Sequence, residues 1–375
     1  MPDEPVLVVF FGGMGGSPIE DLLAGALAEA ALDLLDEALA TGAFSRAVLV
    51  TDTDRLDGRL PPGVEIDRDE GTFHFGRRLR DVVAKRSVRR PVYVGAGSVP
   101  LLRGSDLAAV ARQLAQTESI VISNNYFSAD LVAFAPGDAL DRIDLPAGDN
   151  FLPRLLHDQA GLESQPLPRS SATQFNIDSP ADLALLKLCG GAGSKLTAHL
   201  ETLDLPVDPY RALERFLVDP TAEVLLAGRV GSQVWSYLER ETACRIRLYS
   251  EERGMQAAGR DSSGAARSLL AFHLRDVGVE RFFAHLAELA GCVCIDTRPL
   301  LAHLGVEASR ADRFWSDLGC AGEIDDPFLR EFTAAAAEAR VPVILGGHSL
   351  VSGGLLLVTE HAWREEDQRV LGSQS

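Results

Sequence analysis

The chain has 375 residues, of which 46% are hydrophobic and 24% are charged, as in an average folded protein. At about 150 residues per domain, this length predicts two domains. Fifty-four acidic residues against 36 basic ones leave a net charge of −18, which argues against nucleic acid or an acidic membrane surface as a partner. Small anionic ligands remain compatible with this charge, because a local pocket can be positive on an acidic protein.

Hydropathy and cysteine usage indicate the cellular compartment of the protein. No run approaches the ~18 apolar residues of a membrane helix, and the acidic start over residues 1–5 is unlike a signal peptide. The cysteines are odd in number and lack zinc spacing, which favours free thiols in a reducing compartment. We therefore expect a cytoplasmic protein with no membrane contact, and a homodimer is compatible with this composition. The five cysteines are Cys189, Cys244, Cys292, Cys294 and Cys320.

The first half of the chain alternates apolar runs with amphipathic stretches. The run at 6–11 predicts a buried strand, and a long Leu/Ala helix is expected over 19–40. Apolar strands separated by helices indicate a mostly parallel sheet covered on both faces, and uneven strand spacing favours an open α/β sheet over a barrel. Further strands are predicted at 47–50, 91–94 and 119–123, and further helices at 76–84 and 105–117.

A glycine-rich stretch past the midpoint divides the chain. Cys189–Ser194 has little periodicity, so we place a boundary there. The predicted organisation is a first α/β domain over 1–188, a linker over 189–208, a second α/β domain over 209–363 and a flexible tail over 364–375. In the second domain, strands are predicted at 223–227, 292–295, 341–345 and 355–358, and helices at 232–242, 264–277 and 280–290.

The loop after the first strand is the first candidate site. It reads Gly12-Gly13-Met14-Gly15-Gly16-Ser17, so most of its residues lack the Cβ that would keep backbone away from a phosphate. The helix that follows offers free N–H groups to an anion. We expect nucleotide binding here; the alternative is a tight strand-to-helix turn.

Two later segments have a distinctive pattern. One is the turn containing Gly97 and Ser98, which continues into Pro100-Leu101-Leu102, and the other is Phe175–Leu183, which reads FNIDSPADL. With the glycine loop, they resemble the pattern of the MobA-like nucleotidyltransferases over roughly residues 1–188. The resemblance implies a single domain with the nucleotide-diphospho-sugar transferase fold.

The resemblance also implies a reaction. A nucleotidyl group would pass from a nucleoside triphosphate to a small phosphorylated or carboxylated acceptor, with Mg²⁺ and release of pyrophosphate. The glycine loop, Gly97 and Ser98 would then hold the nucleotide, while Asn176 and Asp178 would face the metal. Asp178 would be catalytic, and Asp130, beyond another predicted strand end, is a second catalytic candidate. On physical grounds alone, the late segment also predicts a helix start, with Ser179 as N-cap.

Departures from the family pattern leave alternatives open. The family's loop carries an Arg and a Lys that are missing here, and its metal-binding Asp is replaced by Ser98. The alternative is a nucleotide- or sugar-nucleotide-binding module without transferase activity. A glycosyltransferase is a third option, with Asp52-Thr53-Asp54 as its DxD motif. Asp149-Asn150 is another candidate for the missing charge at a strand end.

In the second half, several predicted strand ends carry Gly, Arg, Ser and His. This composition predicts a second anion site, for phosphate or carboxylate. The alternative is a set of ordinary turns with ion-paired arginines. A Ser-His-Asp hydrolase of Ser349, His348 and Asp296 is conceivable, but no G-x-S-x-G motif supports it. The residues of the expected anion site are Arg229, Ser232, Arg253, His348 and Ser349.

Overall fold

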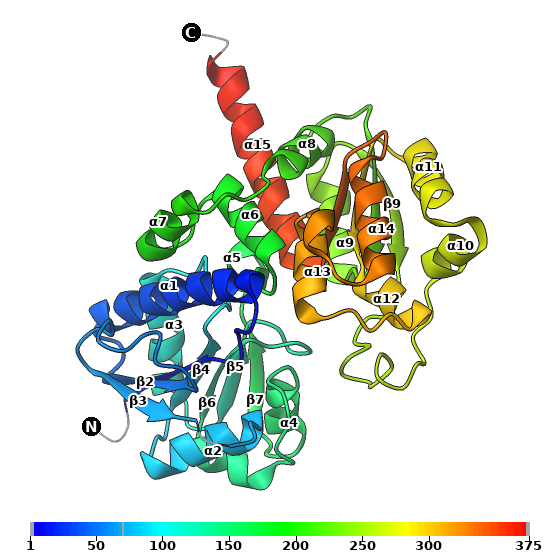
Figure 1. Ribbon diagram of the computed structural model, residues 1–375. Helices are drawn as coiled ribbons and strands as arrows, with labels where there is room; N and C mark the ends of the chain where they lie inside the picture. Colours follow the sequence, from blue (N-terminus) through cyan, green and yellow to red (C-terminus); the bar gives the residue numbers. More distant parts are fainter. Residues whose placement is uncertain (1–3, 70, 373–375) are drawn as a thin grey trace. The chain divides into compact units, whose positions relative to one another are not determined.

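The structure, a computed structural model, describes residues 4–69 and 71–372 and contains two compact units (Figure 1). The first unit comprises residues up to 15, 24–176 and 192–199; the second comprises 16–23, 177–191 and 200 onward. The chain therefore passes between the units at 15/16, 23/24, 176/177, 191/192 and 199/200. Residues 177–188, expected in the first domain, belong to the second unit, where helix α6 (Pro180–Cys189) packs against other helices.

The first unit is built on a seven-stranded sheet with the order β3-β2-β1-β4-β6-β5-β7. Only β6 is antiparallel to its neighbours, so the expected open, mostly parallel sheet is confirmed. Strands β3, β6 and β7 were not predicted from the sequence. The strands are β1 (Val6–Phe11), β2 (Arg46–Thr51), β3 (Val64–Arg68), β4 (Pro91–Gly95), β5 (Ile120–Ser123), β6 (Leu131–Ala135) and β7 (Glu163–Pro166).

Helices cover both faces of this sheet. Helices α1 (Pro18–Ala40) and α3 (Gly104–Ala115) lie on one face, and α2 (Phe75–Lys85) and α4 (Leu152–Asp158) on the other (Figure 1). Successive strand residues point to opposite faces, so the uninterrupted apolar run of β1 buries side chains on both. Two short elements complete the unit: the 3-10 helix η1 (Gly137–Arg142) and α5 (Ser171–Gln174).

The second unit has a parallel four-stranded sheet with the order β11-β10-β8-β9, which confirms a second α/β domain. The strands are β8 (Glu223–Gly228), β9 (Arg245–Ser250), β10 (Cys292–Asp296) and β11 (Val343–Gly346). The chain proceeds from β8 to β9 on one side and then from β9 to β10 on the other. The order therefore reverses between β8 and β10, and open α/β sheets bind ligands at such a point, beyond the carboxyl ends of the strands.

Helices also cover both faces of the second sheet. One face packs against α10 (Leu269–Val277), α11 (Val279–Leu289), α12 (Arg298–Leu304) and α14 (Pro327–Ala337). Helix α15 (Leu355–Gly372) packs against α6, α8 (Asp208–Leu217) and α9 (Ser232–Glu241). The unit also contains α13 (Arg310–Asp317), the 3-10 helix η2 (Ala321–Glu323) and the π-helical turn η3 (Leu350–Gly354). Helix α7 (Ser194–Thr202) begins in the first unit and ends in the second.

Three sequence expectations differ from the structure. The strand predicted at 355–358 is the buried start of α15, because a four-residue apolar run is equally typical of a buried helix. The same helix continues to Gly372 through most of the expected tail 364–375, whose last three residues lie outside the described range. The expected linker 189–208 contains α7. In the described part of the chain, no helix combines the length and apolar character needed to cross a bilayer.

Candidate functional sites

The glycine loop packs against the carboxylate of Asp52. Asp52, directly after β2, accepts hydrogen bonds from the Gly13 N–H at 3.1 Å (Oδ2) and 3.3 Å (Oδ1). A Cβ on Gly12 would lie 2.2 Å from Oδ1 of Asp52, so the absence of a side chain there is explained by this carboxylate. The Gly13 N–H, which was expected to hold a phosphate, is therefore already hydrogen-bonded to Asp52.

Ser17 begins helix α1. Its hydroxyl donates to the Glu20 carboxylate at 2.9 Å and accepts from the Glu20 N–H at 3.4 Å, so Ser17 caps the helix. Glu20 also pairs with Arg310 at 3.6 Å. Ser17 and Gly16 belong to the second unit, whereas Gly12, Gly13 and Gly15 belong to the first.

Asn176 joins predicted residues that are far apart in the sequence. Its Oδ1 accepts a hydrogen bond from the Val99 N–H at 3.1 Å, and its Nδ2 donates to Asp130 at 2.6 Å. Ser98 forms a backbone bridge with Asn176. Val99 has φ +44°, a strained conformation for a β-branched residue. The first sheet therefore brings Ser98, Asp130 and Asn176 together at the carboxyl end of β4.

Tyr93 lies beside this group. Its hydroxyl donates to Asp149 Oδ2 at 2.8 Å. Burial, followed by the charges of Asp149 and Asp130, holds the pKa of Tyr93 well above its usual value. A Cβ on Gly95 would lie 2.7 Å from Ser98 Oγ and 3.6 Å from the Tyr93 oxygen. Asp149 is one of the residues that the sequence offered for the missing charge.

The late motif builds a helix start. Asp182 accepts hydrogen bonds from the Asp178 N–H at 2.9 Å and the Ser179 N–H at 2.8 Å, which confirms the predicted cap of α6. Burial and the nearby Asp178 charge raise the pKa of Asp182 to about 8. The Asp178 side chain itself is exposed and lies in the second unit, while Asn176 lies in the first.

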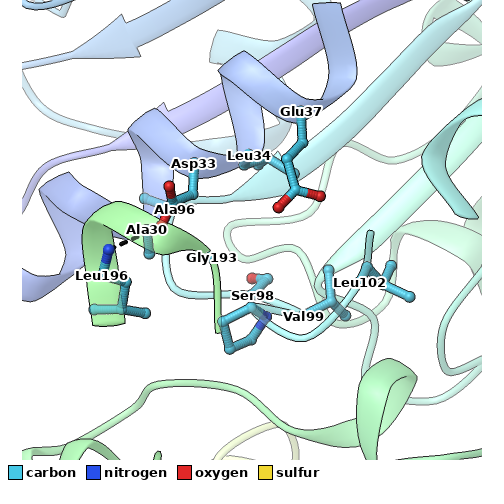
Figure 2. Close-up of a pocket in the computed structure, with 11 residues that line it drawn as sticks. Ala30, Asp33, Leu34, Glu37, Ala96, Ser98, Val99, Leu102, Gly193 and Leu196 are labelled. Atoms are coloured by element: carbon cyan, nitrogen blue, oxygen red, sulfur yellow. Dashed lines mark hydrogen bonds between the residues drawn. The ribbon is translucent and has the colours of Figure 1, made fainter. Parts of the chain in front are cut away.

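Ser98 also lines a narrow pocket of the first unit with acidic residues of α1 (Figure 2). Asp33 accepts hydrogen bonds from Lys195 N at 3.0 Å and Leu196 N at 2.8 Å, and Glu37 accepts one from Gly104 N at 2.8 Å. These carboxylates, one helical turn apart, hold the first turns of α7 and α3. The pocket is therefore explained by helix capping, which the sequence analysis did not foresee.

Basic side chains of helix α2 and of its C-cap, Arg86, bind a carboxylate of β3. Arg78 and Arg86 bind Asp67, with Arg78 at 2.6 Å, and Lys85 lies 3.4 Å from the same carboxylate. Burial of Asp67 raises its pKa, but the hydrogen bonds from the two arginines outweigh this and lower it to about 2. This network uses the charge of α2 within the fold.

In the second unit, a buried ion pair joins β8 to β10. Arg229 donates to Asp296 from Nε at 2.6 Å and from Nη2 at 3.0 Å, and Asp296 is fully buried. Burial raises the pKa of Asp296, but the Arg229 charge outweighs it and the net shift is downward. Gly228 has φ +119°, and a Cβ there would lie 2.4 Å from Asp296 Cβ. The glycine therefore permits the close approach of the two strand ends.

A second buried pair lies at the start of α12. Arg298 donates to Asp317 from Nη1 at 2.8 Å and from Nη2 at 2.6 Å, and it also contacts the Thr297 hydroxyl at 2.7 Å. A Cβ on Gly347 would lie 3.6 Å from Arg298 Nη2, so this guanidinium passes beside the loop after β11. Neither Arg298 nor Asp317 was among the predicted site residues.

The loop after β11 carries His348 and Ser349. Nδ1 of His348 is buried and has no hydrogen-bond partner among the described residues. Burial, with the charge of Arg229, lowers the pKa of His348 to about 4. The Ser349 side chain hydrogen-bonds Asp182, and Asp296 pairs with Arg229. The structure therefore does not form the Ser-His-Asp arrangement.

The other predicted members of the anion site lie at the β8 and β9 ends. Ser232 is exposed in the first turn of α9, and Arg253 follows β9. A Cβ on Gly231 would lie 3.7 Å from Arg253 Nη2, which places that guanidinium beside the N-terminus of α9. The second sheet thus brings together Arg229, Ser232 and Arg253.

One group in the second unit combines metal-binding residue types. Single ligand atoms of Cys189, Glu214 and His361 all lie within 4.8 Å of one another. Nδ1 of His361 is hydrogen-bonded to Glu214. Burial and the Glu214 charge raise the pKa of the Cys189 thiol, so it is protonated at neutral pH. Within the described residues, this group is explained as a packed thiol beside a His–Glu pair.

The fold defines two α/β domains with polar residues at the carboxyl ends of their strands. No protein-family model matches the chain, and no curated protein matches it. Solved structures similar to it include one from Desulfovibrio desulfuricans G20 described as a nucleotide-diphospho-sugar transferase (16% identity, 54% of this chain and 95% of that one, TM-score 0.41). A cytidylyltransferase from Leptospira borgpetersenii is 16% identical over 53% of this chain and 92% of that one, with a TM-score of 0.38. A CMP:2-keto-3-deoxy-manno-octonic acid synthetase solved with CTP is 13% identical over 44% and 89%, with a TM-score of 0.32. Similarity at this level shows no shared activity.

Proposed function

We propose that the chain is an NTP-dependent nucleotidyltransferase whose first unit binds the nucleotide at the carboxyl edge of its sheet. The observation that carries this proposal is the contact of Asn176 with both the Val99 N–H and Asp130. It joins three segments that the sequence singled out separately, at the edge where open α/β sheets bind ligands. The acceptor is a small phosphorylated or carboxylated molecule.

Magnesium is the proposed cofactor, and the oxygen donors of this edge suit a hard cation. Asn176 is a poor ligand, because its amide oxygen and nitrogen both have protein partners. Asp130 and Asp149 fit better, because each carboxylate has a second oxygen besides the one that accepts from Asn176 or from the Tyr93 hydroxyl. When bound, Mg²⁺ would neutralise charge on the triphosphate. Asp178 remains the other catalytic candidate.

The test combines pyrophosphate release with thermal shifts for ATP, GTP, CTP and UTP, each with and without Mg²⁺. A nucleotide at a hundredfold over its Kd adds about 2.7 kcal/mol, on the order of 5–10 °C for a domain of this size. We expect one nucleotide to stabilise the chain only with Mg²⁺ and to release pyrophosphate with an acceptor panel. Asp130→Asn and Asp178→Ala should each reduce release by about 100-fold. The control is Asp81→Asn, an exposed carboxylate paired with its neighbour Arg80.

A second candidate is nucleotide or sugar-nucleotide binding without transfer. It is favoured by the Asp52 carboxylate on the Gly13 N–H and by Ser98 in place of an acid. This candidate predicts an equal shift with and without Mg²⁺, including shifts with UDP-sugars, and no pyrophosphate. If none of these compounds changes the melting temperature, both candidates are contradicted.

A further inference from the structure

The carboxyl edge of the second sheet gathers polar residues from all four strands. Arg229 follows β8, Asp296 ends β10, and His348 follows β11. Glu251 and Arg253 follow β9. Because the strands are parallel, these residues all lie at one edge, on both sides of the point where the strand order reverses.

Two buried polar atoms at this edge lack partners among the described residues, Nδ1 of His348 and Oε1 of Glu251. Nearly all buried polar atoms in folded proteins are hydrogen-bonded, so such atoms mark places where a ligand or water completes the structure. Burial raises the pKa of Glu251 and lowers that of His348, and the Asp296 charge adds to the first shift and opposes the second. The lowered pKa leaves His348 neutral at physiological pH. Its Nδ1 can therefore form one hydrogen bond, as donor or acceptor, with an uncharged polar group of a ligand.

The charges at this edge leave a positive position beside α9. Arg229 is neutralised by Asp296, and Arg298 by Asp317. Arg253 forms no hydrogen bond or ion pair with any residue that the structure describes, and its guanidinium lies beside Gly231, the N-cap of α9. Because Gly231 has no side chain to cap the helix, an anion could accept hydrogen bonds from the first N–H groups of α9.

We propose that this edge binds a small phosphorylated polyol. The phosphate would contact Arg253 and the first turn of α9, and hydroxyl groups would bond to Glu251 Oε1 and His348 Nδ1. Phosphate suits the arginine and the N–H groups, because both donate charge-assisted hydrogen bonds to its oxygens. An acceptor oxygen on Glu251 calls for a donor on the ligand, which a polyol hydroxyl supplies and the dianionic phosphate group of a monoester does not.

The test is calorimetric titration of the full chain with glycerol 3-phosphate, inorganic phosphate and glycerate at matched ionic strength. We expect glycerol 3-phosphate to bind more tightly than the other two. Arg253→Gln should weaken its binding by about 10- to 100-fold, because a charge-assisted contact is lost. The matched control is Arg240→Gln. It changes an exposed arginine in the last turn of α9, away from the helix N-terminus, and should leave binding unchanged. Glu251→Gln should weaken glycerol 3-phosphate but not inorganic phosphate.

Several results would overturn this site. One is that neither glycerol 3-phosphate nor inorganic phosphate binds at millimolar concentration, and another is that glycerate binds more tightly than glycerol 3-phosphate. The site is also overturned if the two arginine variants weaken binding equally, or if Glu251→Gln does not change the affinity for glycerol 3-phosphate. Unchanged melting temperatures of the variants would show that they fold. The site is independent of nucleotidyl transfer, so Asp130→Asn should leave glycerol 3-phosphate binding intact.

Discussion

Arg229 forms two hydrogen bonds with the fully buried carboxylate of Asp296, at 2.6 and 3.0 Å, and so ties the ends of β8 and β10 together. The pair stands where the order of the second sheet reverses. It also sets the charge of the edge, because it neutralises Arg229 and leaves Arg253 as the arginine beside α9.

Removing one partner of this pair should be costly. Asp296→Asn leaves the Arg229 guanidinium buried without a counter-charge, and we expect a loss of about 3–5 kcal/mol in the free energy of unfolding. Urea titration of the second unit's signal measures this loss. Asp276→Asn breaks the exposed Arg275–Asp276 pair of the same unit and should cost no more than about 1 kcal/mol. Equal effects would show that burial of the pair is unimportant.

Asp182 should make the stability of the fold depend on pH. Its pKa is about 8 in the folded chain against 3.8 for an unperturbed aspartate, so the folded state holds a proton that the unfolded state releases. This contribution is complete below about pH 4 and is lost as the pH rises to about 8, with a slope of at most about 1.4 kcal/mol per pH unit. Asp182→Asn should remove this part of the slope in urea titrations between pH 5 and 8. Parallel wild-type and variant curves would contradict the raised pKa.

Asn176 should stabilise the strained turn at Val99. Asn176→Ala leaves the Val99 N–H and the Asp130 carboxylate without this partner, and we expect a loss of about 1–3 kcal/mol in the free energy of unfolding. Asn125→Ala, which removes one exposed hydrogen bond to the Phe127 N–H, should change it by no more than about 0.5 kcal/mol. Denaturant unfolding compares the two, and a silent Asn176→Ala would show that the contact contributes no net stability.

Gly228 should tolerate no side chain. Gly228→Ala places a Cβ at φ +119° and 2.4 Å from Asp296 Cβ, and should cost about 3 kcal/mol or more. Gly16→Ala is the matched control, because it has φ +113° but its nearest atom, Glu20 Oε2, would lie 3.7 Å away, and it should cost about 1–2 kcal/mol. Thermal unfolding of both variants separates crowding from backbone strain. Similar costs would mean that the strand ends move apart easily.

Local patterns in the sequence determined much of the fold. The apolar run of β1 and the Ser179–Asp182 cap of α6 were predicted where they occur, because strand burial and helix capping depend on neighbouring residues. The apolar run at 355–358 was mistaken for a strand, since local hydrophobicity does not distinguish a buried strand from a buried helix.

Only the tertiary structure decided which of these residues meet. Asn176 contacts Asp130 across 46 residues and Arg229 contacts Asp296 across 67, and no local pattern encodes such pairings. In the folded chain, the carboxylates of Asp52, Asp33 and Glu37 accept hydrogen bonds from backbone N–H groups. The physical reason is that side-chain partners and burial depend on how strands and helices pack, whereas periodicity and capping depend on the chain nearby.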